Sequence, residues 1–478
     1  MWPFKRKVKA LENMIADRAF HAAQFNNLLN KWAKTTEQID ADLQRGGHAL
    51  RARARDMAKN NVYAKKYLNI LKTNVVGKDG IRLQCQAKNR NGQLDVSANS
   101  LVEQAWQQFC QPGECDVTGR LSIIDAQSLM VLGEARDGEY LIREYDGYKN
   151  SFGYALQFID PDLLDEDHNE DLANGRYIRM GIEYNKNGFP INYHLTPIRN
   201  DRVRGKSYRD SRSRSVVPAS EIIHGYLQEF SNQSRGFSWM HAAMVEMHHL
   251  GAFREAAIIA SRIGASNMGF FTEGLEGGSF TGDGKTASGD LQIDIEPGVF
   301  RKLPAGVDFK MFDSKYPSDM VDAFEMRSLK GIASGLNISY PVLASDPSST
   351  SYGTMRGFTI DDRDYFRGLQ NRLSSLTLQR IYRGFLRNGL KNGSIGLPAD
   401  RYQKLLEVKW QPRGWQWIDP AKDAAAYKIL DEKQMIDEFT IAAERGMDLE
   451  EIYQQRAAAK KLREKYKLTE TEANNAEA

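Results

Sequence analysis

The sequence predicts an α+β protein in which long helices flank a region of short strands. Two stretches, 239–263 and 318–336, place apolar residues at helical spacing, whereas apolar and polar residues alternate through much of 139–228. Residues 421–467 are rich in Ala, Lys and Glu, and we expect them to be purely helical. With 478 residues, of which 41% are hydrophobic, the chain can form two to four domains.

The composition argues against several classes of protein. The sequence has no apolar run long enough to span a membrane, and its first residues lack the apolar core of a signal peptide, so we expect a protein kept in a cytoplasm. A net charge of +3 does not mark the whole chain as a nucleic-acid binder. Cys85, Cys110 and Cys115 lack the spacing of a zinc site, and we interpret them as ordinary thiols.

The N-terminal part is predicted to be helical up to about residue 75. A solvated helix face or a subunit contact explains the cations of segment 50–71 best, because basic helix faces of this kind are common in proteins that do not bind nucleic acid; a nucleic-acid contact is the alternative. A strand at 81–84 and helices at 98–110 and 122–135 follow. The cations of the basic segment are Arg51, Arg53, Arg55, Lys59, Lys65 and Lys66.

The region 139–228 is expected to be β-rich with helices packed against it. Asn187-Gly188 predicts a hairpin turn between its last two strands. The basic segment 199–214 has few apolar residues, and we predict a mobile surface loop there. The predicted strands are 140–145, 155–159, 176–184 and 191–195.

A glycine-rich segment separates the two long central helices. Residues 274–289 contain six glycines and cannot be regular helix or strand throughout. Ser318 is expected to cap the second helix. A polar, proline-interrupted loop at 339–352 and a long helix at 352–390 follow, and the three tryptophans within 410–417 are expected to anchor a core.

Gly284-Lys285-Thr286 is the nearest approach to an enzyme motif. A P-loop needs a glycine at the position that Ser279 occupies, and it must lie between a buried strand and a helix. His241, His248 and His249 share one predicted helix, but no two of them lie four residues apart and no acidic or cysteine partner completes a metal set. We therefore predict no catalytic residue, no metal and no cofactor.

Asp319, Asp322 and Glu325 fall at three-residue spacing near the start of the second central helix. Favourable interaction with the positive helix N-terminus is the simpler explanation. The alternative is that these acids, repeated around a ring, line a channel and repel a DNA backbone.

Several segments occur in a characteristic order. They are NVVGKDGIRLQ near residue 75, FIDPDLL at 158–164, the helix at 239–263, SGLNISYPVLASDPSSTSY at 334–352, and WIDPAKDAAAYKIL followed by ERGMDLEEIYQQR near the C-terminus. In this order the chain resembles the lambda-type family of tailed-bacteriophage portal proteins over nearly its whole length. The resemblance implies a dodecameric ring at one capsid vertex, through which double-stranded DNA is packaged and ejected.

The resemblance also implies a division into wing, stem, clip and crown. The wing takes 1–236, the two stem helices take 237–266 and 317–337, and the clip between them takes 267–316. A further part, 338–420, holds a tunnel loop, a long helix and the rest of the wing. Residues 421–478 are the helical crown and a polar tail.

Three groups of site residues follow from this resemblance. The tunnel loop brings neutral or small side chains to the channel, acids of the second stem helix are candidates to line it, and clip residues are candidates to dock a terminase motor that hydrolyses ATP. The groups are Ser345, Asp346, Ser348, Ser349, Thr350 and Tyr352 in the loop; Asp319, Asp322 and Glu325 in the stem; and Glu276, Asp283, Lys285 and Asp290 in the clip.

The implied partners are further copies of the chain, double-stranded DNA, the large terminase subunit, the major capsid protein or scaffold, and a head-tail connector protein, with no membrane. The implied location is the portal vertex of the virion, with host cytoplasm during assembly. Two alternatives remain open: a P-loop-like packaging NTPase that uses Gly284-Lys285-Thr286, and a DNA-binding protein without sequence preference that acts through segments 51–66 and 199–214.

Overall fold

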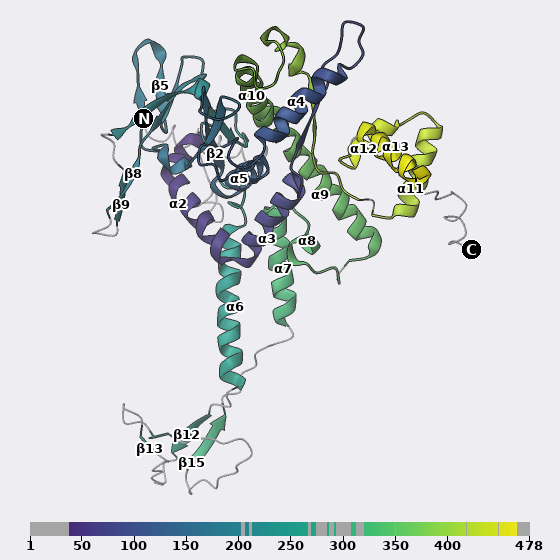
Figure 1. Ribbon diagram of the computed structural model, residues 1–478. Helices are drawn as coiled ribbons and strands as arrows, with labels where there is room; N and C mark the ends of the chain where they lie inside the picture. The colour runs from purple at the N-terminus through teal and green to yellow at the C-terminus, as the bar shows by residue number, and fades with distance from the viewer. Residues whose placement is uncertain are drawn as a thin grey trace, which may run out of the picture.

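The mixed α+β class is confirmed. A body of helices and sheets carries a two-helix stalk on one side and a small helical module on another (Figure 1). The computed structural model describes residues 38–201, 206–209, 213–265, 269–273, 284–285, 291–292, 307–311, 320–348, 350–416, 418–447 and 449–465. Glu276, Asp283, Asp290, Asp319, Ser349 and Trp417, which carry sequence predictions, lie outside these residues.

The predicted helix over 50–71 is two helices, α2 (Ile39–Asn60) and α3 (Val62–Leu71). Asn61 between them has extended backbone angles, and its side chain accepts hydrogen bonds from the backbone N–H groups of Tyr63 and Ala64. Asn61 therefore ends α2 and caps α3, which a sequence periodicity alone does not reveal. A π-helical turn, η2 (Lys72–Val76), continues α3.

The centre of the body is a three-stranded antiparallel sheet in the order β11-β2-β3. Helix α5 packs against β2, and α10 packs against β2 and β3. A second ribbon pairs β1 with β16, so two segments more than 300 residues apart in sequence lie side by side. The bounds are α4 (Val96–Phe109), α5 (Ile123–Asp137), β1 (Arg82–Cys85), β2 (Glu139–Asp146), β3 (Tyr154–Ile159), β11 (Ile222–Tyr226) and β16 (Val408–Gln411).

A five-stranded sheet in the order β10-β7-β6-β5-β4 lies beside it. The predicted strand 176–184 is wrong as one strand, because Met180 and Gly181 both take positive φ and turn β5 back along β6. The Asn187-Gly188 turn between β6 and β7 is confirmed. The bounds are β4 (Glu170–Asp171), β5 (Tyr177–Arg179), β6 (Ile182–Tyr184), β7 (Pro190–Leu195) and β10 (Ser215–Pro218).

The predicted mobile loop 199–214 instead contains a hairpin, β8 (Ile198–Asp201) paired with β9 (Lys206–Arg209). Backbone pairing does not require apolar side chains on both faces, so a basic and polar segment can still form an antiparallel ribbon.

The stalk consists of α6 (Met244–Ala265) and α7 (Met320–Gly335). The first helix begins five residues later than predicted. Trp239 donates its backbone N–H to Ala135, and Ser238 donates its hydroxyl to the same carbonyl, which holds the residues before α6 in turns against α5. Beyond the stalk lie two strand pairs, β12 (Gly269–Glu273) with β15 (Val307–Met311) and β13 (Gly284–Lys285) with β14 (Leu291–Gln292).

The stalk leads back into the body through α8 (Tyr340–Ala344) and α9 (Tyr352–Arg372). The predicted helix 352–390 is continuous in direction but contains a π-helical segment, η7 (Leu373–Leu378), before α10 (Gln379–Lys391). Short 3-10 turns complete the body: η3 (Pro161–Leu163), η4 (Ala173–Gly175), η6 (Ala219–Glu221), η8 (Ala399–Arg401) and η9 (Lys404–Leu406). The helical module at the C-terminal end comprises α11 (Pro420–Glu432), α12 (Glu438–Glu444) and α13 (Leu449–Lys465).

Aromatic rings fill the main core. Phe385 on α10 lies with its ring centroid 5.1 Å from Trp106, 5.0 Å from Phe109 and 5.3 Å from Phe152. Trp410 joins this cluster at 6.1 Å from Trp106, so one of the predicted tryptophan anchors is confirmed. The three cysteines are free, and burial raises the pKa of Cys85 and of Cys115 to about 12, as expected of unreactive thiols.

Candidate functional site

The polar loop between α8 and α9 is held at both ends. Ser339, which precedes α8, donates its backbone N–H and its hydroxyl to the buried carboxylate of Asp362 on α9, at 3.0 and 2.6 Å. Ser345 takes a left-handed conformation and ends α8. Ser351 caps α9 through the backbone N–H of Thr354. The loop therefore leaves and re-enters the body at fixed points.

The loop also bonds to itself. Asp346 accepts hydrogen bonds from the Tyr340 hydroxyl at 2.9 Å and from the Ser348 backbone N–H at 3.0 Å, and the Ser348 hydroxyl also donates to it. The Ser348 hydroxyl and N–H, with the Tyr340 hydroxyl, lower the pKa of Asp346. The Thr350 hydroxyl donates to the Pro347 carbonyl at 2.9 Å. The carboxylate of this loop is thus turned inward among hydroxyl groups.

A groove of about 650 Å³ lies between this loop, the end of α7 and α9. Its lining combines a cation, Lys330, with polar side chains such as Asn337 and Thr354 and with the ring of Phe358. The ammonium of Lys330 lies 5.6 Å from the ring centroid of Tyr340, a cation–π distance that ties α7 to α8.

The contacts between the two stalk helices include an ion pair and a ring pair. Arg254 on α6 donates to Glu325 on α7 at 2.8 Å, and its guanidinium lies 5.2 Å from the Tyr63 ring of α3. Phe253 and Phe324 lie 5.0 Å apart, although Phe324 remains half exposed. Glu325 is therefore turned toward α6, while Asp322 is exposed on α7. Of the stem acids that the structure describes, Asp322 is the better candidate to face a channel.

Lys285 lies in β13 and pairs with Leu291 of β14. A P-loop lysine instead opens a helix whose N-terminus holds the phosphates. A strand position for Gly284 and Lys285 does not provide the helix start that the NTPase alternative requires at this lysine.

A buried ion-pair network joins the body to the start of the stalk. Glu139, fully buried on β2, accepts hydrogen bonds from Arg235 and from His224 at 2.9 Å, and Arg51 of α2 reaches it at 3.2 Å. Arg51 also pairs with Asp162 at 2.7 Å and with Glu166 at 2.8 Å. Arg55, one helical turn later, shares Asp162 with Arg51 and pairs with two more carboxylates, those of Asp137 and Asp160.

These contacts set the protonation of the network. Burial opposes ionisation of Glu139, but the Arg235 charge and the hydrogen bonds from His224 and Arg235 outweigh it, and the pKa of Glu139 lies well below its usual value. Burial lowers the pKa of His224, which favours the neutral imidazole. A neutral His224 donates one N–H to Glu139.

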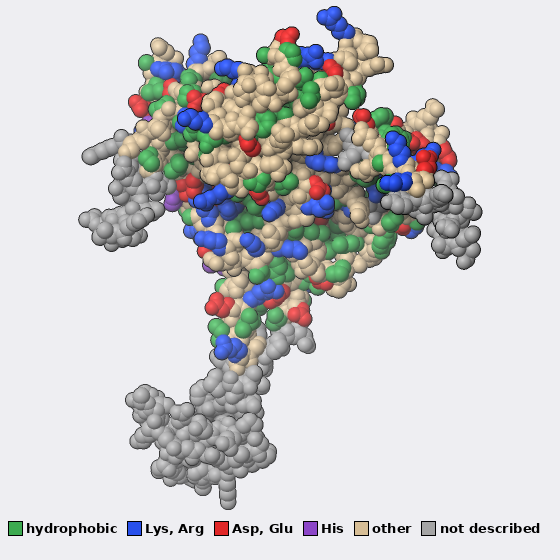
Figure 2. All heavy atoms as spheres, in the orientation of Figure 1, with side chains coloured by type: hydrophobic (Ala, Val, Ile, Leu, Met, Phe, Trp, Pro, Cys, Tyr) green, Lys and Arg blue, Asp and Glu red, His purple; other side chains and the backbone are tan. Residues whose placement is uncertain are grey.

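The basic segment 50–71 is therefore not uniform. Arg51 and Arg55 were expected on a solvated face or a contact with another molecule, but they point into the body, whereas Arg53, Lys59 and Lys65 are exposed. A signal was present in the sequence: Ala54, Met57 and Ala58 share the same helix face as Arg51 and are buried with it. Figure 2 shows exposed Lys and Arg side chains on the body above the stalk.

A cluster of arginines joins α9 to the segment before α11. The Trp415 ring lies 5.8 Å from the Arg363 guanidinium and 5.6 Å from that of Arg367. Two turns nearer the loop, Arg356 pairs with Asp423 of α11 at 2.8 Å. These contacts attach the C-terminal helical module to the helix that follows the polar loop.

The described residues provide neither a metal site nor a membrane-spanning helix. No group of three or more His, Cys, Asp or Glu side chains among them could hold a metal ion. Within the same residues, every helix is too short or too polar to cross a membrane.

Comparison with known sequences gives a consistent answer. Residues 25–370 match the family model described as phage portal protein, lambda family. The chain is 33% identical over 447 residues to a probable portal protein of Halomonas phage phiHAP-1, covering 92% of this chain and 85% of that protein. It is 22% identical over 465 residues to portal protein B of Escherichia phage lambda, covering 90% and 87%.

Solved structures give a more distant likeness. A chain in the virion of a native gene transfer agent particle aligns with a TM-score of 0.44 and 14% identity, covering 86% of this chain and 94% of that one. A chain in the neck of the native particle, computed with C12 symmetry, gives the same values. Likenesses at this TM-score support no argument about the chain, whereas the sequence matches do.

Proposed function

Because the chain belongs to the lambda family of phage portal proteins, we propose that its copies form a dodecameric ring at one capsid vertex. The ring surrounds a channel through which double-stranded DNA enters and leaves the capsid. The observation that supports this role best is the stalk, in which α6 and α7 carry small strand pairs at one end and the self-bonded polar loop at the other (Figure 1). Contacts between two different surfaces of neighbouring copies form a closed ring when the rotation from each copy to the next returns the last copy to the first.

The parts of the chain take the following roles in this proposal. Residues 1–236 and most of 338–420 form the wing, 237–266 and 317–337 the stem, 267–316 the clip, and 421–478 the crown and tail. The clip, with Lys285 and the neighbouring candidates Glu276, Asp283 and Asp290, docks the large terminase subunit, and a head-tail connector protein binds later. ATP hydrolysis belongs to the terminase, and the wing contacts the capsid protein or scaffold. The ring forms in the host cytoplasm and remains in the virion.

The polar loop supplies the DNA-facing surface of the channel. Its exposed groups are hydroxyls such as those of Ser348 and Thr350, and its carboxylate at Asp346 is already bonded internally. Ser345, Ser349 and Tyr352 complete this surface. A moving polyanion needs weak contacts without base recognition, and neutral hydroxyls whose hydrogens are bonded within the loop make only weak contacts, without counterion release. Asp322 adds a repulsive charge on the stem, while Glu325 contributes less because Arg254 neutralises it.

The first test is the mass of the purified assembly, measured by native mass spectrometry with rotational averaging of negative-stain images. We expect a closed ring of twelvefold symmetry with a central hole. A stable monomer or dimer at micromolar concentration would contradict the proposed ring. Lys285→Ala tests the NTPase alternative in the same preparation: a measurable ATPase activity that this substitution abolishes would contradict a purely structural role.

The second test concerns the loop. Ser348→Lys/Thr350→Lys adds cations to every copy around the channel, so we expect the ring to retain duplex DNA at least tenfold more tightly at low salt, with a steeper salt dependence. Gln108→Lys/Gln111→Lys is the matched control, because both side chains are exposed on or next to α4, away from the loop. Equal effects of the two variants would argue against a channel role for the loop.

A further inference from the structure

The module formed by α11, α12 and α13 buries very little of its own apolar surface. Within the described residues of 420–465, Ala442 is the only buried hydrophobic side chain. Amphipathic helices derive most of their stability from burying an apolar face, and a module of this size cannot remain folded without such burial. Its exposed apolar side chains are Ile429, Met435, Phe439, Tyr453 and Leu462.

Two of these side chains border a groove with an acidic rim. The groove, of about 600 Å³, lies where α11 turns into α12, and Met435 and Phe439 line it together with Ile436. The carboxylates at its edge belong to Asp431, Asp437 and Glu438. Such a groove accepts a helix that presents an apolar or aromatic side chain with cations beside it.

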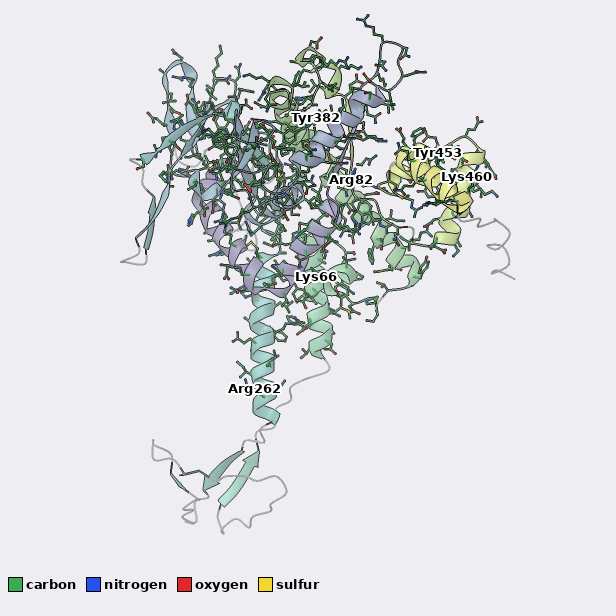
Figure 3. All side chains as sticks on the ribbon, in the orientation of Figure 1. Lys66, Arg82, Arg262, Tyr382, Tyr453 and Lys460 are labelled. Atoms are coloured by element: carbon green, nitrogen blue, oxygen red, sulfur yellow. The ribbon has the colours of Figure 1, made fainter. Side chains whose placement is uncertain are left out.

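Helix α13 presents a surface of that kind. Tyr453, Arg456, Lys460 and Arg463 follow one another at spacings of three, four and three residues, which places them on one face of the helix. All four are exposed, and Figure 3 shows Tyr453 and Lys460 on this helix. Among the described residues, no ion pair involves Arg456, Lys460 or Arg463.

The same chain cannot bring this stripe fully into its own groove. The Tyr453 hydroxyl already donates to Glu438 of the same chain, which fixes the start of α13 at one edge of the groove. At about 1.5 Å per residue, Lys460 and Arg463 lie about 10 and 15 Å further along the helix axis. Figure 2 shows acidic, basic and hydrophobic side chains together on the exposed surface of the module.

We propose that the basic stripe of α13, from Arg456 to Arg463, docks on the acidic groove between α11 and α12 of the next copy of the chain. The occupant is a second copy because the two surfaces are complementary in charge, and both are present on every chain. Two different surfaces that fit each other form a heterologous contact, which closes a ring. This inference rests on the proposed function and identifies the contact that holds the crown together.

The experiment reverses the charges on each side and measures the NaCl concentration at which the purified ring dissociates, by mass photometry. The groove variant is Asp431→Lys/Glu438→Lys and the stripe variant is Lys460→Glu/Arg463→Glu. We expect each alone to lower the dissociation midpoint at least threefold, and the combination of all four changes to restore at least half of the loss. Lys433→Glu/Lys461→Glu has the same net charge change as the stripe variant, lies outside both surfaces, and should leave the midpoint unchanged.

Two further measurements keep the outcome unambiguous. Glu438→Ala alone reports the loss of the bond to Tyr453 within one chain, and Asp431→Cys/Lys460→Cys should give a ladder of covalent multimers on oxidation if the two surfaces meet between copies. Any one of three outcomes would overturn the proposal. They are an unchanged dissociation midpoint in both reversal variants, no recovery of the midpoint in the combined variant, and a cross-link that forms only within single chains. A stripe variant that keeps its ring but loses DNA binding would overturn it too, in favour of a nucleic-acid contact. If the wild type forms no ring, it is the proposed function that fails.

Discussion

The buried network around Glu139 and the helical module at 420–465 use the same kinds of charged residue in opposite ways. Arg51, Arg235 and Glu139 are almost fully buried, and each has several partners from distant parts of the same chain. The cations of α13 are exposed on a module with almost no core. The first region is complete within one chain, whereas the second has apolar and charged surfaces that no other described residue of the chain covers. Substitutions in the two regions should therefore have different consequences for the subunit and for the assembly.

The largest effect is expected at the network. Arg235→Met leaves the buried Glu139 carboxylate without its principal counter-charge, and breaking a buried ion pair on one side costs about 3–5 kcal/mol of unfolding free energy. Urea unfolding of the subunit at high salt, where rings are dissociated, measures this cost. Arg387→Met is the control because its ion pair with Asp146 is about half exposed, and the expected loss is below about 1 kcal/mol. Similar losses in the two variants would mean that burial does not distinguish these pairs.

The second prediction compares two phenylalanines. Phe385 is fully buried among aromatic rings, and Phe385→Ala should destabilise the subunit by about 3–5 kcal/mol through lost transfer energy and a cavity. Phe439 is two-thirds exposed on α12, and Phe439→Ala should change subunit stability by less than about 0.5 kcal/mol while weakening the assembly. Denaturant unfolding of the subunit and ring dissociation, measured side by side, check both halves. If Phe439→Ala lowered the unfolding free energy of the subunit as much as Phe385→Ala does, the two phenylalanines would not differ in the way that we expect.

How far the sequence predicted these regions depends on how local the determining contacts are. The stalk helices, the Asn187-Gly188 turn and the α+β class follow from short-range periodicity and turn chemistry, and the structure has them. Asn61, Met180 and the π-helical turns were missed because their conformations depend on single caps and on packing across the body.

The charged partners were missed for a related reason. Arg51 was expected on the protein surface because its carboxylate partners lie 88 or more residues away in sequence. The residue pattern of a single helix does not indicate such distant partners. The boundaries of wing, stem, clip and crown and the channel-lining residues came from a family resemblance rather than from periodicity, and they remain predictions.

The third prediction concerns pH. Burial lowers the pKa of His224 below its usual value near 6.5, so the unfolded chain binds a proton that the folded chain does not. The stability that this difference supplies is present above about pH 6.5 and is lost as the pH falls toward the lowered folded pKa, with a slope of at most about 1.4 kcal/mol per pH unit. His224→Gln should make unfolding free energy less dependent on pH between about 6.5 and 5, measured on dissociated subunits.

The smallest effect is expected in the stalk, where an ion pair is intermediate in exposure between the buried network and the helical module. The pair of Arg254 with Glu325 is neither buried like the network nor fully exposed like the cations of α13, since about a third of the arginine side chain and a fifth of the carboxylate side chain are exposed. Glu325→Gln keeps a hydrogen bond to Arg254 and loses only a partly screened charge, so the subunit should lose less than about 1 kcal/mol. Asp322→Asn, with no such partner among the described residues, should be neutral for the subunit. If both changes leave the subunit stable but only Asp322→Asn increases DNA retention by the ring, the channel-facing role belongs to Asp322. Retention equal to that of the wild type in both variants would mean that α7 presents neither carboxylate to the DNA.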